Sequence, residues 1–324
     1  MDRKNQYRKL IRQFPGLIRR DERLANHTSI KIGGRADLFC GAHSTEALLQ
    51  VLGAARDLQI PTILIGGGSN LLVDDRGYRA LIVKFLNQES PQLNFPLLTI
   101  SAGNSLNSLL QYAARQSLSG LEFLAGIPGA VGGAIYMNAG AYGKSISDVV
   151  RQAVIINDAG KLQTVAPDFF RFTYRGSILQ ACPATVVSVT FGVDHGHSRA
   201  IREEYRRILA LRANKHPKPS IPCAGSYFKN LLPEKPGENY RPAGHFLENA
   251  GAKSMKVGGA AVYGRHANII INSGNATAQD VLELAEQMKE AVYGMYGLTL
   301  EEEVRFLDSK NGMVSSATRQ MRRE

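Results

Sequence analysis

The chain has 324 residues, of which 44% are hydrophobic, 21% charged and 7% aromatic. This composition excludes a disordered chain, a collagen-like chain and a coiled coil, and a length above about 250–300 residues predicts about two domains. The formal net charge is +11, and no apolar run reaches the roughly 18 residues that cross a bilayer, so no membrane insertion is expected.

The positive charge is concentrated at the two ends of the chain. Residues 1–23 carry eight Lys and Arg side chains against three acidic ones, and residues 309–324 carry four against one. The body of the chain therefore has a net charge of only about +3, which suits small anionic ligands as well as a polyanion. We expect solvated basic ends, disordered at the C-terminus, and no nucleic-acid partner.

The N-terminal region and the cysteines indicate the compartment. The first residues lack the continuous apolar stretch of a secretory signal. Their apolar side chains instead recur at the spacing of an amphipathic helix, at Leu10, Ile11, Phe14, Leu17 and Ile18. The three cysteines are widely spaced and form no CxxC pair, which excludes a disulfide framework and a zinc site. We therefore predict a cytoplasmic protein without a metal.

The first section of the chain mixes short strands with one helix. Strands are predicted at residues 36–39, 61–65 and 80–85 from their apolar runs. The segment STEALLQVLGAARDL at 44–58 has apolar residues at helical spacing behind a Ser/Thr cap, which predicts an amphipathic helix.

Two further sections follow. The second is predicted to contain strands at 97–101, 154–156 and 186–191 and helices at 105–116 and about 199–213. The basic, Pro-containing segment 215–219 is typical of a linker. Beyond it, residues 226–297 end in a helix capped near Thr277 and Asp280, and a strand at 300–307 closes the ordered chain. The elements do not follow a strict βαβ order, which favours an α+β fold over a Rossmann sheet.

The first glycine segment comes directly after the strand at 61–65. It consists of Gly66, Gly67, Gly68, Ser69 and Asn70. Three glycines let the backbone approach a ligand closely and present N–H groups as an anion-binding nest, and the two polar side chains add hydrogen bonds. A flexible turn between two strands is the simpler interpretation, but three glycines exceed what a turn requires, which favours phosphate binding.

The second glycine segment, AGIPGAVGGA at 125–134, continues through small residues to 143. Its spacing GxxGxxGG differs from the dinucleotide-binding GxGxxG, and neither segment contains the GK[ST] of a Walker-type NTPase. Small residues over this length indicate a rigid wall with many backbone donors. The two segments together suit a diphosphate-bridged cofactor, although a packed helix–sheet crossing also uses small residues.

Three residues are candidates for chemistry. Arg175 follows an aromatic run at 169–172, where a fixed guanidinium could stabilise an oxyanion or enolate, or simply cover aromatic surface. Ser226 lacks the GxSxG elbow of a nucleophile, and its surroundings are more typical of a turn or cap serine. In the strand at 300–307, alternation puts Glu301, Glu303 and Arg305 on one face, as in a solvated edge strand.

Taken together, these segments resemble one family, the UDP-N-acetylenolpyruvoylglucosamine reductases. The resemblance runs in order from about residue 24 to 307. The matching stretches are NHTS at 26–29, IGG at 32–34, GGGSNLLV at 66–73, LEFLAGIPGAVGGAIYMNAGAYG at 121–143, YRGS at 174–177, AGSYFKN at 224–230, AGHFLENAGAK at 243–253, HANIIIN at 266–272 and LEEEVRF at 300–306.

The resemblance implies an FAD- and NADPH-dependent reduction of UDP-N-acetylenolpyruvoylglucosamine to UDP-N-acetylmuramate for peptidoglycan synthesis. Arg175 and Glu303 would stabilise the enol intermediate that follows hydride addition at C3, and Ser226 would protonate C2. Substrate contacts would come from Tyr174, Lys215 and Asn230. FAD would contact Gly66, Gly67, Gly68, Ser69, Asn70, Gly126, Gly129, Gly132, Gly133, Asn138 and Gly140.

The implied fold is an FAD-binding pair of α+β subdomains of the vanillyl-alcohol-oxidase type with a smaller α+β substrate domain. We expect the subdomains at 1–85, closed by a strand at 298–308, and at 86–214, the substrate domain at 215–297, and a basic tail at 309–324. Residues 174–193 are compact and lack the tyrosine-bearing insertion of one branch of the family. The chain thus resembles the shorter branch, which leaves open what covers the substrate.

Two other functions remain open at this point. One is a different FAD-dependent oxidase or dehydrogenase on the same fold, which would leave AGSYFKN and LEEEVRF without a role. The other is a non-catalytic nucleotide-sugar or nucleic-acid binding protein, in which Arg175, Ser226 and Glu303 would be inert. The sequence does not determine the oligomeric state, although we favour a monomer.

Overall fold

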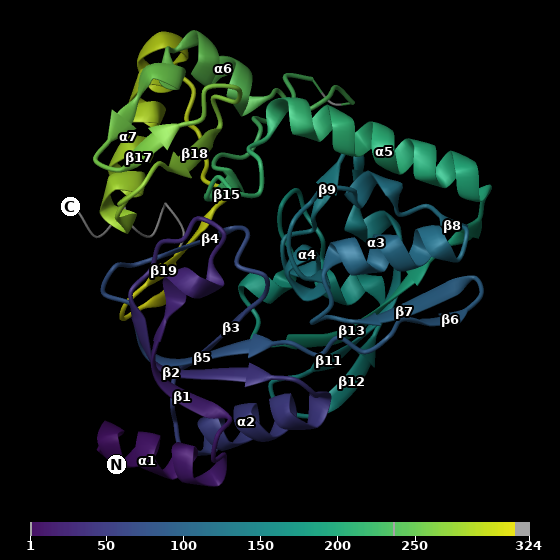
Figure 1. The fold of residues 1–324 in the computed structure, drawn as a ribbon, viewed down its shortest axis with the longest axis vertical. Helices are drawn as coiled ribbons and strands as arrows, with labels where there is room; N and C mark the ends of the chain where they lie inside the picture. Colours follow the sequence, from purple (N-terminus) through teal and green to yellow (C-terminus); the bar gives the residue numbers. More distant parts are fainter. Residues whose placement is uncertain (1, 236, 315–324) are drawn as a thin grey trace. The chain divides into compact units, whose positions relative to one another are not determined.

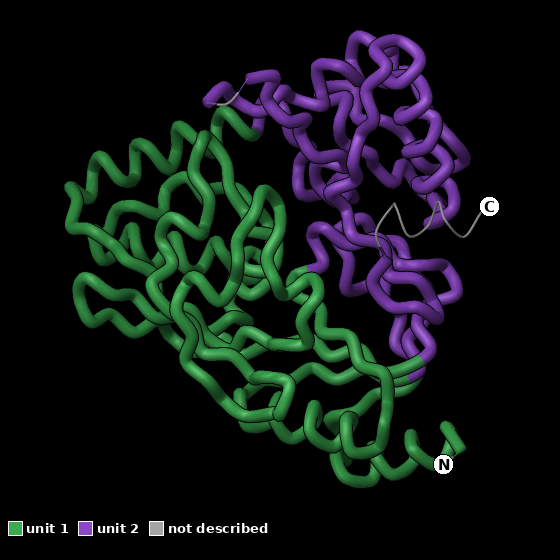
Figure 2. The backbone as a smooth tube through the Cα atoms, turned by 180° about the vertical axis from the view of Figure 1, so that it is seen from behind, with its two compact units in different colours: residues 1–20, 38–67, 80–212 green, residues 21–37, 68–79, 213–324 purple. Residues whose placement is uncertain are grey.

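The computed structural model describes residues 2–235 and 237–314. The chain divides into two compact units, shown in different colours in Figure 2. Unit 1 contains residues 1–20, 38–67 and 80–212, and unit 2 contains residues 21–37, 68–79 and 213–324. Each unit has its own hydrophobic core.

The first sheet of unit 1 has the strand order β1-β2-β5-β3. Strands β1, β2 and β5 each extend past the bounds of unit 1, so one end of each strand belongs to unit 2. Helix α2 buries Leu48 and Val51 in the same core as the sheet residue Leu81. The helix begins where predicted, because the Ser44 hydroxyl accepts a hydrogen bond from Ala47 N at 3.1 Å. The elements are α1 (Arg3–Gln13), β1 (Ile18–Arg23), β2 (Arg35–Ala42), α2 (Thr45–Asp57), β3 (Thr62–Ile65) and β5 (Tyr78–Phe85).

The second sheet of unit 1 is antiparallel, with the order β12-β11-β13-β7-β6. Helices α3 and α4 lie over one face of this sheet (Figure 1). The bounds are β6 (Gln92–Asn94), β7 (Leu97–Ser101), α3 (Leu106–Arg115), α4 (Val131–Tyr136), β11 (Val150–Ile156), β12 (Leu162–Val165), β13 (Thr185–Gly192) and α5 (Ser198–Lys215). Two short pairs, β8 (Leu118–Ser119) with β14 (Asp194–His195) and β9 (Gly140–Ala141) with β10 (Lys144–Ser145), complete the unit.

Unit 2 contains a four-stranded sheet, β15-β18-β17-β16, and a three-stranded sheet, β20-β19-β4. Helix α7 packs on the first sheet and starts at a capping box, in which Thr277 Oγ1 accepts from Asp280 N at 3.0 Å. The elements are β4 (Leu71–Val73), β15 (Cys223–Ser226), α6 (Ala243–Asn249), β16 (Lys256–Val257), β17 (Ala260–Val262), β18 (Ile269–Asn272), α7 (Ala278–Tyr296), β19 (Arg305–Asp308) and β20 (Gly312–Val314).

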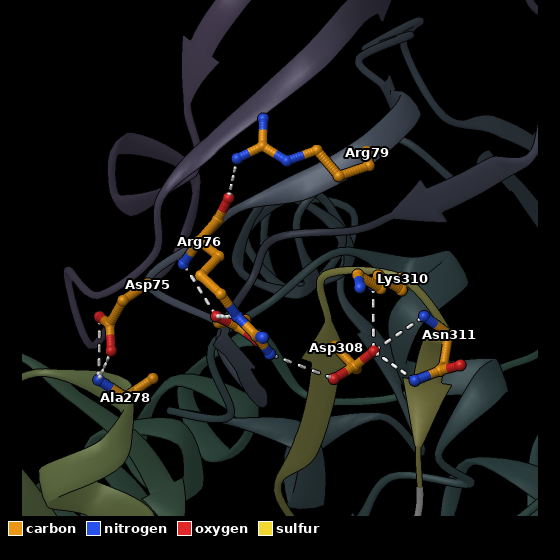
Figure 3. A network of polar contacts seen from close by, with 8 residues as sticks. Asp75, Arg76, Arg79, Ala278, Asp308, Lys310 and Asn311 are labelled. Carbon is orange, nitrogen blue, oxygen red and sulfur yellow. Dashed lines mark hydrogen bonds and ion pairs between the residues drawn. The ribbon is translucent and has the colours of Figure 1, made fainter. Parts of the chain in front are cut away.

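A polar network in unit 2 joins the turn after β4 to two other elements (Figure 3). Arg76 Nη2 lies 2.6 Å from Asp74 Oδ2 and 3.8 Å from Asp308 Oδ2, which connects the turn to the β19–β20 hairpin. Asp75 Oδ2 accepts from Ala278 N at 2.8 Å at the start of α7. A cavity of about 500 Å³ borders this network, and none of the predicted site residues lines it.

Most predicted elements are confirmed, including the capped helices α2 and α7 and the α+β class. The N-terminal helix is shorter than predicted, because Pro15 and Gly16 (φ +79°) end it and Ile18 opens β1. The last strand begins only at Arg305, and β20 follows it. The predicted alternation nevertheless holds, since Glu302 and Val304 are buried and Glu301 is exposed. Residues 315–324 of the predicted tail lie outside the described residues.

Candidate active site

The two glycine segments meet backbone to backbone within unit 1. A Cβ atom on Gly67 would lie 2.9 Å from Gly129 Cα and 3.2 Å from Ala130 N. A Cβ atom on Gly66 would lie 3.7 Å from Gly133 Cα. Because these residues have no side chains, the backbone that follows β3 approaches the start of α4 more closely than larger residues would allow.

The surface around Gly133 fits a cofactor that needs close backbone contact. A Cβ atom on Gly133 would meet no atom within 4 Å, and the neighbouring Gly66 carries no side chain to fill the space. Gly126 and Gly129 have φ values of +70° and +132°, a backbone that side chains rarely adopt. Gly132 and Gly140 instead pack tightly, with Cβ positions 3.1 Å from Ala102 Cβ and 2.3 Å from Lys144 O.

The first glycine segment passes from unit 1 to unit 2 between Gly67 and Gly68. Gly68 has φ +72°, its carbonyl accepts from Ser29 N at 3.0 Å, and a Cβ atom there would lie 1.9 Å from His27 O. Ser69 O lies 4.0 Å from the Cβ position of Gly225, beside β15. The Asn70 side chain is already engaged, because its Nδ2 donates to Glu303 O at 3.0 Å.

Arg175 and its neighbours form one polar cluster in unit 1. Arg175 Nη2 donates to Gly140 O at 3.0 Å, and its guanidinium carbon lies 5.1 Å from the centre of the Tyr174 ring. Asn138, which is buried, donates from Nδ2 to Thr173 O at 2.9 Å and so holds the segment that precedes Tyr174. The structure thus brings together four predicted site residues: Asn138, Gly140, Tyr174 and Arg175.

A second arginine of unit 1 belongs to this cluster and was not predicted. A Cβ atom on Gly126 would lie 2.7 Å from Arg212 Cδ, so the Arg212 side chain occupies the space that this glycine leaves. Burial lowers the pKa of Arg212, the Tyr142 hydroxyl acts against that shift, and the charge of Arg175 adds to it. The arginine stands on a charged helix with many cations, so no sequence signal distinguished it.

In unit 2, Ser226 and Glu303 lie on neighbouring backbone segments. Ser226 is the last residue of β15 and pairs with Ile269 of β18. Tyr227 O accepts from Glu303 N at 2.7 Å, and Lys229 N donates to Glu301 O at 2.8 Å. The segment carrying Glu303 therefore continues alongside the residues after Ser226, and both side chains are half-buried.

Two predicted substrate contacts, Asn230 and Lys215, also lie in unit 2. Asn230 Oδ1 accepts from Ala243 N at 3.2 Å, at the start of α6. Lys215 is the last residue of α5, and it lies close enough to His266 to act on its titration. Burial is the main cause of the lowered pKa of His266, and the charges of Lys215 and Lys253 add to it.

Two buried polar residues under these segments were also not predicted. Lys289 of α7 lies with its Nζ 3.4 Å from Glu302 Oε1, and the Glu302 side chain is 3% exposed. Asn268, 2% exposed, donates from Nδ2 to Phe228 O at 2.8 Å.

Burial raises the pKa of the nearby Cys223 thiol, which disfavours a reactive thiolate. Within residues 2–235 and 237–314, no group of three or more His, Cys, Asp or Glu side chains is arranged to hold a metal ion.

Family models match both halves of the chain. Residues 216–307 match the model described as UDP-N-acetylenolpyruvoylglucosamine reductase, C-terminal domain, and residues 36–166 match the model described as FAD binding domain. The range 36–166 contains both glycine segments, and the range 216–307 contains Ser226 and Glu303.

In the described part of the chain, no helix combines the length and apolar character that a membrane crossing requires.

Individual relatives extend these matches over nearly the whole chain. The UDP-N-acetylenolpyruvoylglucosamine reductase of Anoxybacillus flavithermus is 37% identical over 303 residues, 93% of this chain and 98% of the relative. That of Heliobacterium modesticaldum is 38% identical over 306 residues, 94% of this chain and 95% of the relative. The crystal structure of UDP-N-acetylenolpyruvylglucosamine reductase from Thermus caldophilus has a TM-score of 0.74 at 31% identity, over 88% of this chain and 97% of that one. The chain therefore belongs to the UDP-N-acetylenolpyruvoylglucosamine reductase family, as its motifs predicted.

Proposed function

We propose that this chain reduces UDP-N-acetylenolpyruvoylglucosamine to UDP-N-acetylmuramate, with NADPH as the reductant and FAD as the bound cofactor, in peptidoglycan synthesis. The observation that carries the proposal is the Ser226–Glu303 arrangement: a hydroxyl and a carboxylate on hydrogen-bonded neighbouring segments in a member of this family. An inert binding protein would need neither group in this position.

Bound FAD would supply the transfer of hydride from NADPH to the substrate. The residues that would hold it are Gly66, Gly67, Gly126, Gly129, Gly132, Gly133, Asn138 and Gly140 of unit 1, and Gly68, Ser69 and Asn70 of unit 2. The backbone approach between Gly66 and Gly133 supports this assignment, because it leaves a surface without side chains for a phosphate or ring system.

Arg175 and Glu303 stabilise the substrate after hydride has arrived at C3 of the enolpyruvyl group. Addition at C3 breaks the C2–C3 double bond and moves negative charge onto C2 and the adjacent carboxylate. A guanidinium held by Gly140 O offsets that charge without having to reorganise, which is the most effective form of electrostatic stabilisation. Glu303 orients the enol form.

Ser226 delivers the proton to C2 and completes the reduction. A neutral serine is a weak acid, so its proton leaves only because the carbanion at C2 is strongly basic. Tyr174, Lys215 and Asn230 contact the nucleotide-sugar. As part of the same proposal, residues 1–85 and 86–214 are the FAD-binding subdomains, and 215–297 the substrate domain.

The decisive experiment follows the visible absorbance of the purified protein, supplemented with FAD, under anaerobic conditions. NADPH should bleach the flavin band, and UDP-N-acetylenolpyruvoylglucosamine should restore it with one equivalent of UDP-N-acetylmuramate formed. A bleached band that returns only when air is admitted would contradict the reductase and favour an oxidase. A protein that takes up no FAD would overturn the cofactor assignment.

We also propose that the enzyme acts in the cytoplasm as a monomer on this small-molecule substrate. All three cysteines are free, as the reducing cytoplasm maintains them. Light scattering on a size-exclusion column tests the oligomeric state, because a mass near twice 35.3 kDa would contradict the monomer.

A further inference from the structure

The segment that carries Ser226 leaves its sheet abruptly. β15 pairs with β18 at Cys223–Ile271 and again at Ser226–Ile269, so β15 has one extra residue between the two pairs. Gly225, with φ +78°, accommodates this bulge. After Ser226 no regular ladder continues, although Tyr227 and Phe228 are only 2% and 1% exposed. Their backbone groups are buried and need other partners, since an unsatisfied buried peptide group is destabilising.

Asn268 supplies those partners. Its main-chain oxygen accepts from Tyr227 N at 2.8 Å. Its side chain accepts from Phe228 N through Oδ1 at 2.9 Å and donates from Nδ2 to Phe228 O at 2.8 Å. A carboxamide presents one acceptor and one donor side by side, as a peptide group does, so this side chain takes the place of a partner strand for Phe228 on the side of β18, while Glu302 pairs with Phe228 on the other side.

We infer that Asn268 is a positioning residue for proton delivery by Ser226. The three hydrogen bonds of Asn268 to Tyr227 and Phe228, called the clamp below, fix the two residues after Ser226, and Tyr227 O in turn accepts from Glu303 N at 2.7 Å. One residue therefore holds the main chain next to both the proton donor and the carboxylate, because its main-chain oxygen binds Tyr227 and its buried side chain binds Phe228. The inference rests on the proposed function, because it gives Asn268 a role in the reaction only if Ser226 has one.

Asn268 is itself held in place from its N-terminal side. Asn268 N donates to His266 Nδ1 at 3.2 Å, which requires the imidazole to be unprotonated at that nitrogen. Burial and the charges of Lys215 and Lys253 lower the pKa of His266 and so favour this state. The hydrogen bonds of Asn268 to Phe228 and the bond from Asn268 N to His266 are therefore all satisfied when the His266 imidazole is neutral.

The test is the substitution Asn268→Asp, which keeps the size and the acceptor but places an oxygen against Phe228 O. We expect formation of UDP-N-acetylmuramate from the reduced enzyme, measured by chemical quench in a single turnover and here called the substrate step, to slow by about tenfold or more, because general-acid delivery contributes about 10²–10⁴-fold and depends on position. Reduction by NADPH, measured separately by stopped flow, should stay within about twofold. In D₂O the isotope effect on the substrate step should increase, since proton transfer becomes rate-limiting.

Asn272, the last residue of the adjoining strand β18, offers a matched control. Its buried side chain donates to Ile30 O at 3.1 Å and accepts from Gly274 N, away from the residues that follow Ser226. Asn272→Asp should lower thermal stability without a selective effect on the substrate step. If Asn268→Asp does not fold with bound flavin, Asn268→Ser, which admits a bridging water, should give a smaller loss in the same step.

Ser226→Ala separates failure of the inference from failure of the proposed function. If Ser226→Ala slows the substrate step and the double variant with Asn268→Asp is no slower, Asn268 acts through Ser226. If Ser226→Ala is slow but folded Asn268 variants match the native enzyme, or lose both half-reactions equally, the inference is overturned and the function stands. If Ser226→Ala has no effect, the role of Ser226 is overturned and that of Asn268 with it.

Discussion

In unit 1, the backbone at Gly67 lies against Gly129 because neither residue has a side chain, whereas in unit 2 the backbone at Phe228 is held by the buried amide of Asn268. In the first region the missing Cβ atoms of the glycines allow the close approach of the two backbones, and in the second the hydrogen bonds of a buried amide hold the main chain. Added volume should therefore damage the glycine surface, while lost hydrogen bonds or charges should damage the Ser226–Glu303 segments.

An asparagine side chain holds the main chain near each of the three proposed catalytic residues, and two of these asparagines, Asn138 and Asn268, are buried. Asn138 donates to Thr173 O near Arg175, and Asn70 donates to Glu303 O. Asn268 clamps Phe228 near Ser226. Each amide holds the main chain rather than the reacting side chain.

The largest loss of stability is expected in unit 2 from Lys289→Met. The substitution removes the cation that lies 3.4 Å from the carboxylate of Glu302, a side chain that is 3% exposed, and also the ion pair of Lys289 with Glu286 at 2.7 Å. Breaking a buried ion pair from one side costs about 3–5 kcal/mol. Urea unfolding measures this cost. The double variant Lys289→Met with Glu302→Leu should recover most of it, and a single variant that loses less than about 1 kcal/mol would contradict the buried-pair interpretation.

Arg175→Lys tests the polar part of unit 1. Lysine keeps the charge but lacks the planar fork that reaches Gly140 O and stacks on Tyr174, so we expect about a 100-fold loss in the rate of the substrate step. Steady-state turnover and single-turnover oxidation measure it. Arg171→Lys, an exposed arginine of the same segment, is the control and should be neutral. Equal losses in the two variants would contradict the role of Arg175.

The glycine surface could be predicted from the sequence, because a missing side chain is visible in the sequence itself. The helices α2 and α7 were also predictable, since Ser44 and Thr277 are local capping signals. Arg175, Ser226 and Glu303 each had a simpler interpretation as isolated residues, and only the ordered resemblance to one family singled them out.

Asn268, Lys289 and Arg212 could not be predicted, because their importance depends on burial that distant segments create. Asn268 stands in a strand-like run, HANIIIN, where nothing local indicates that its amide points to Phe228. Lys289 sits on a helix rich in charged residues, and its pairing with Glu302 exists only in the folded unit. Tertiary contacts of this kind have no periodic signal.

Gly133→Ala tests the glycine surface of unit 1, and its expected effects on stability and FAD affinity are smaller. The position is helical and open, so a methyl group there should stabilise the helix of the apoprotein by about 0.5–1 kcal/mol yet weaken FAD binding by about tenfold, because it projects onto the proposed cofactor surface. Gly53→Ala in α2 is the matched control, with equal space and no predicted ligand. Titration with FAD and thermal unfolding measure the two effects, and unchanged FAD affinity would contradict the cofactor surface.

The smallest effect concerns the network of unit 2 away from the Ser226–Glu303 segments. Burial raises the pKa of Asp74, but hydrogen bonds from Arg76 and Ser309 outweigh it and leave the pKa below its usual value. A carboxyl whose folded pKa is depressed adds stability above its unfolded pKa, about 3.9, and loses it as the pH falls toward the folded value. Asp74→Asn should therefore cost about 1 kcal/mol at pH 7, since Arg76 is largely exposed, and little near pH 2. Urea unfolding between pH 2 and 7 measures the difference. A cost that stays constant with pH would mean that Asp74 acts through shape alone, and the contrast between buried polar groups and absent side chains would not extend to this network.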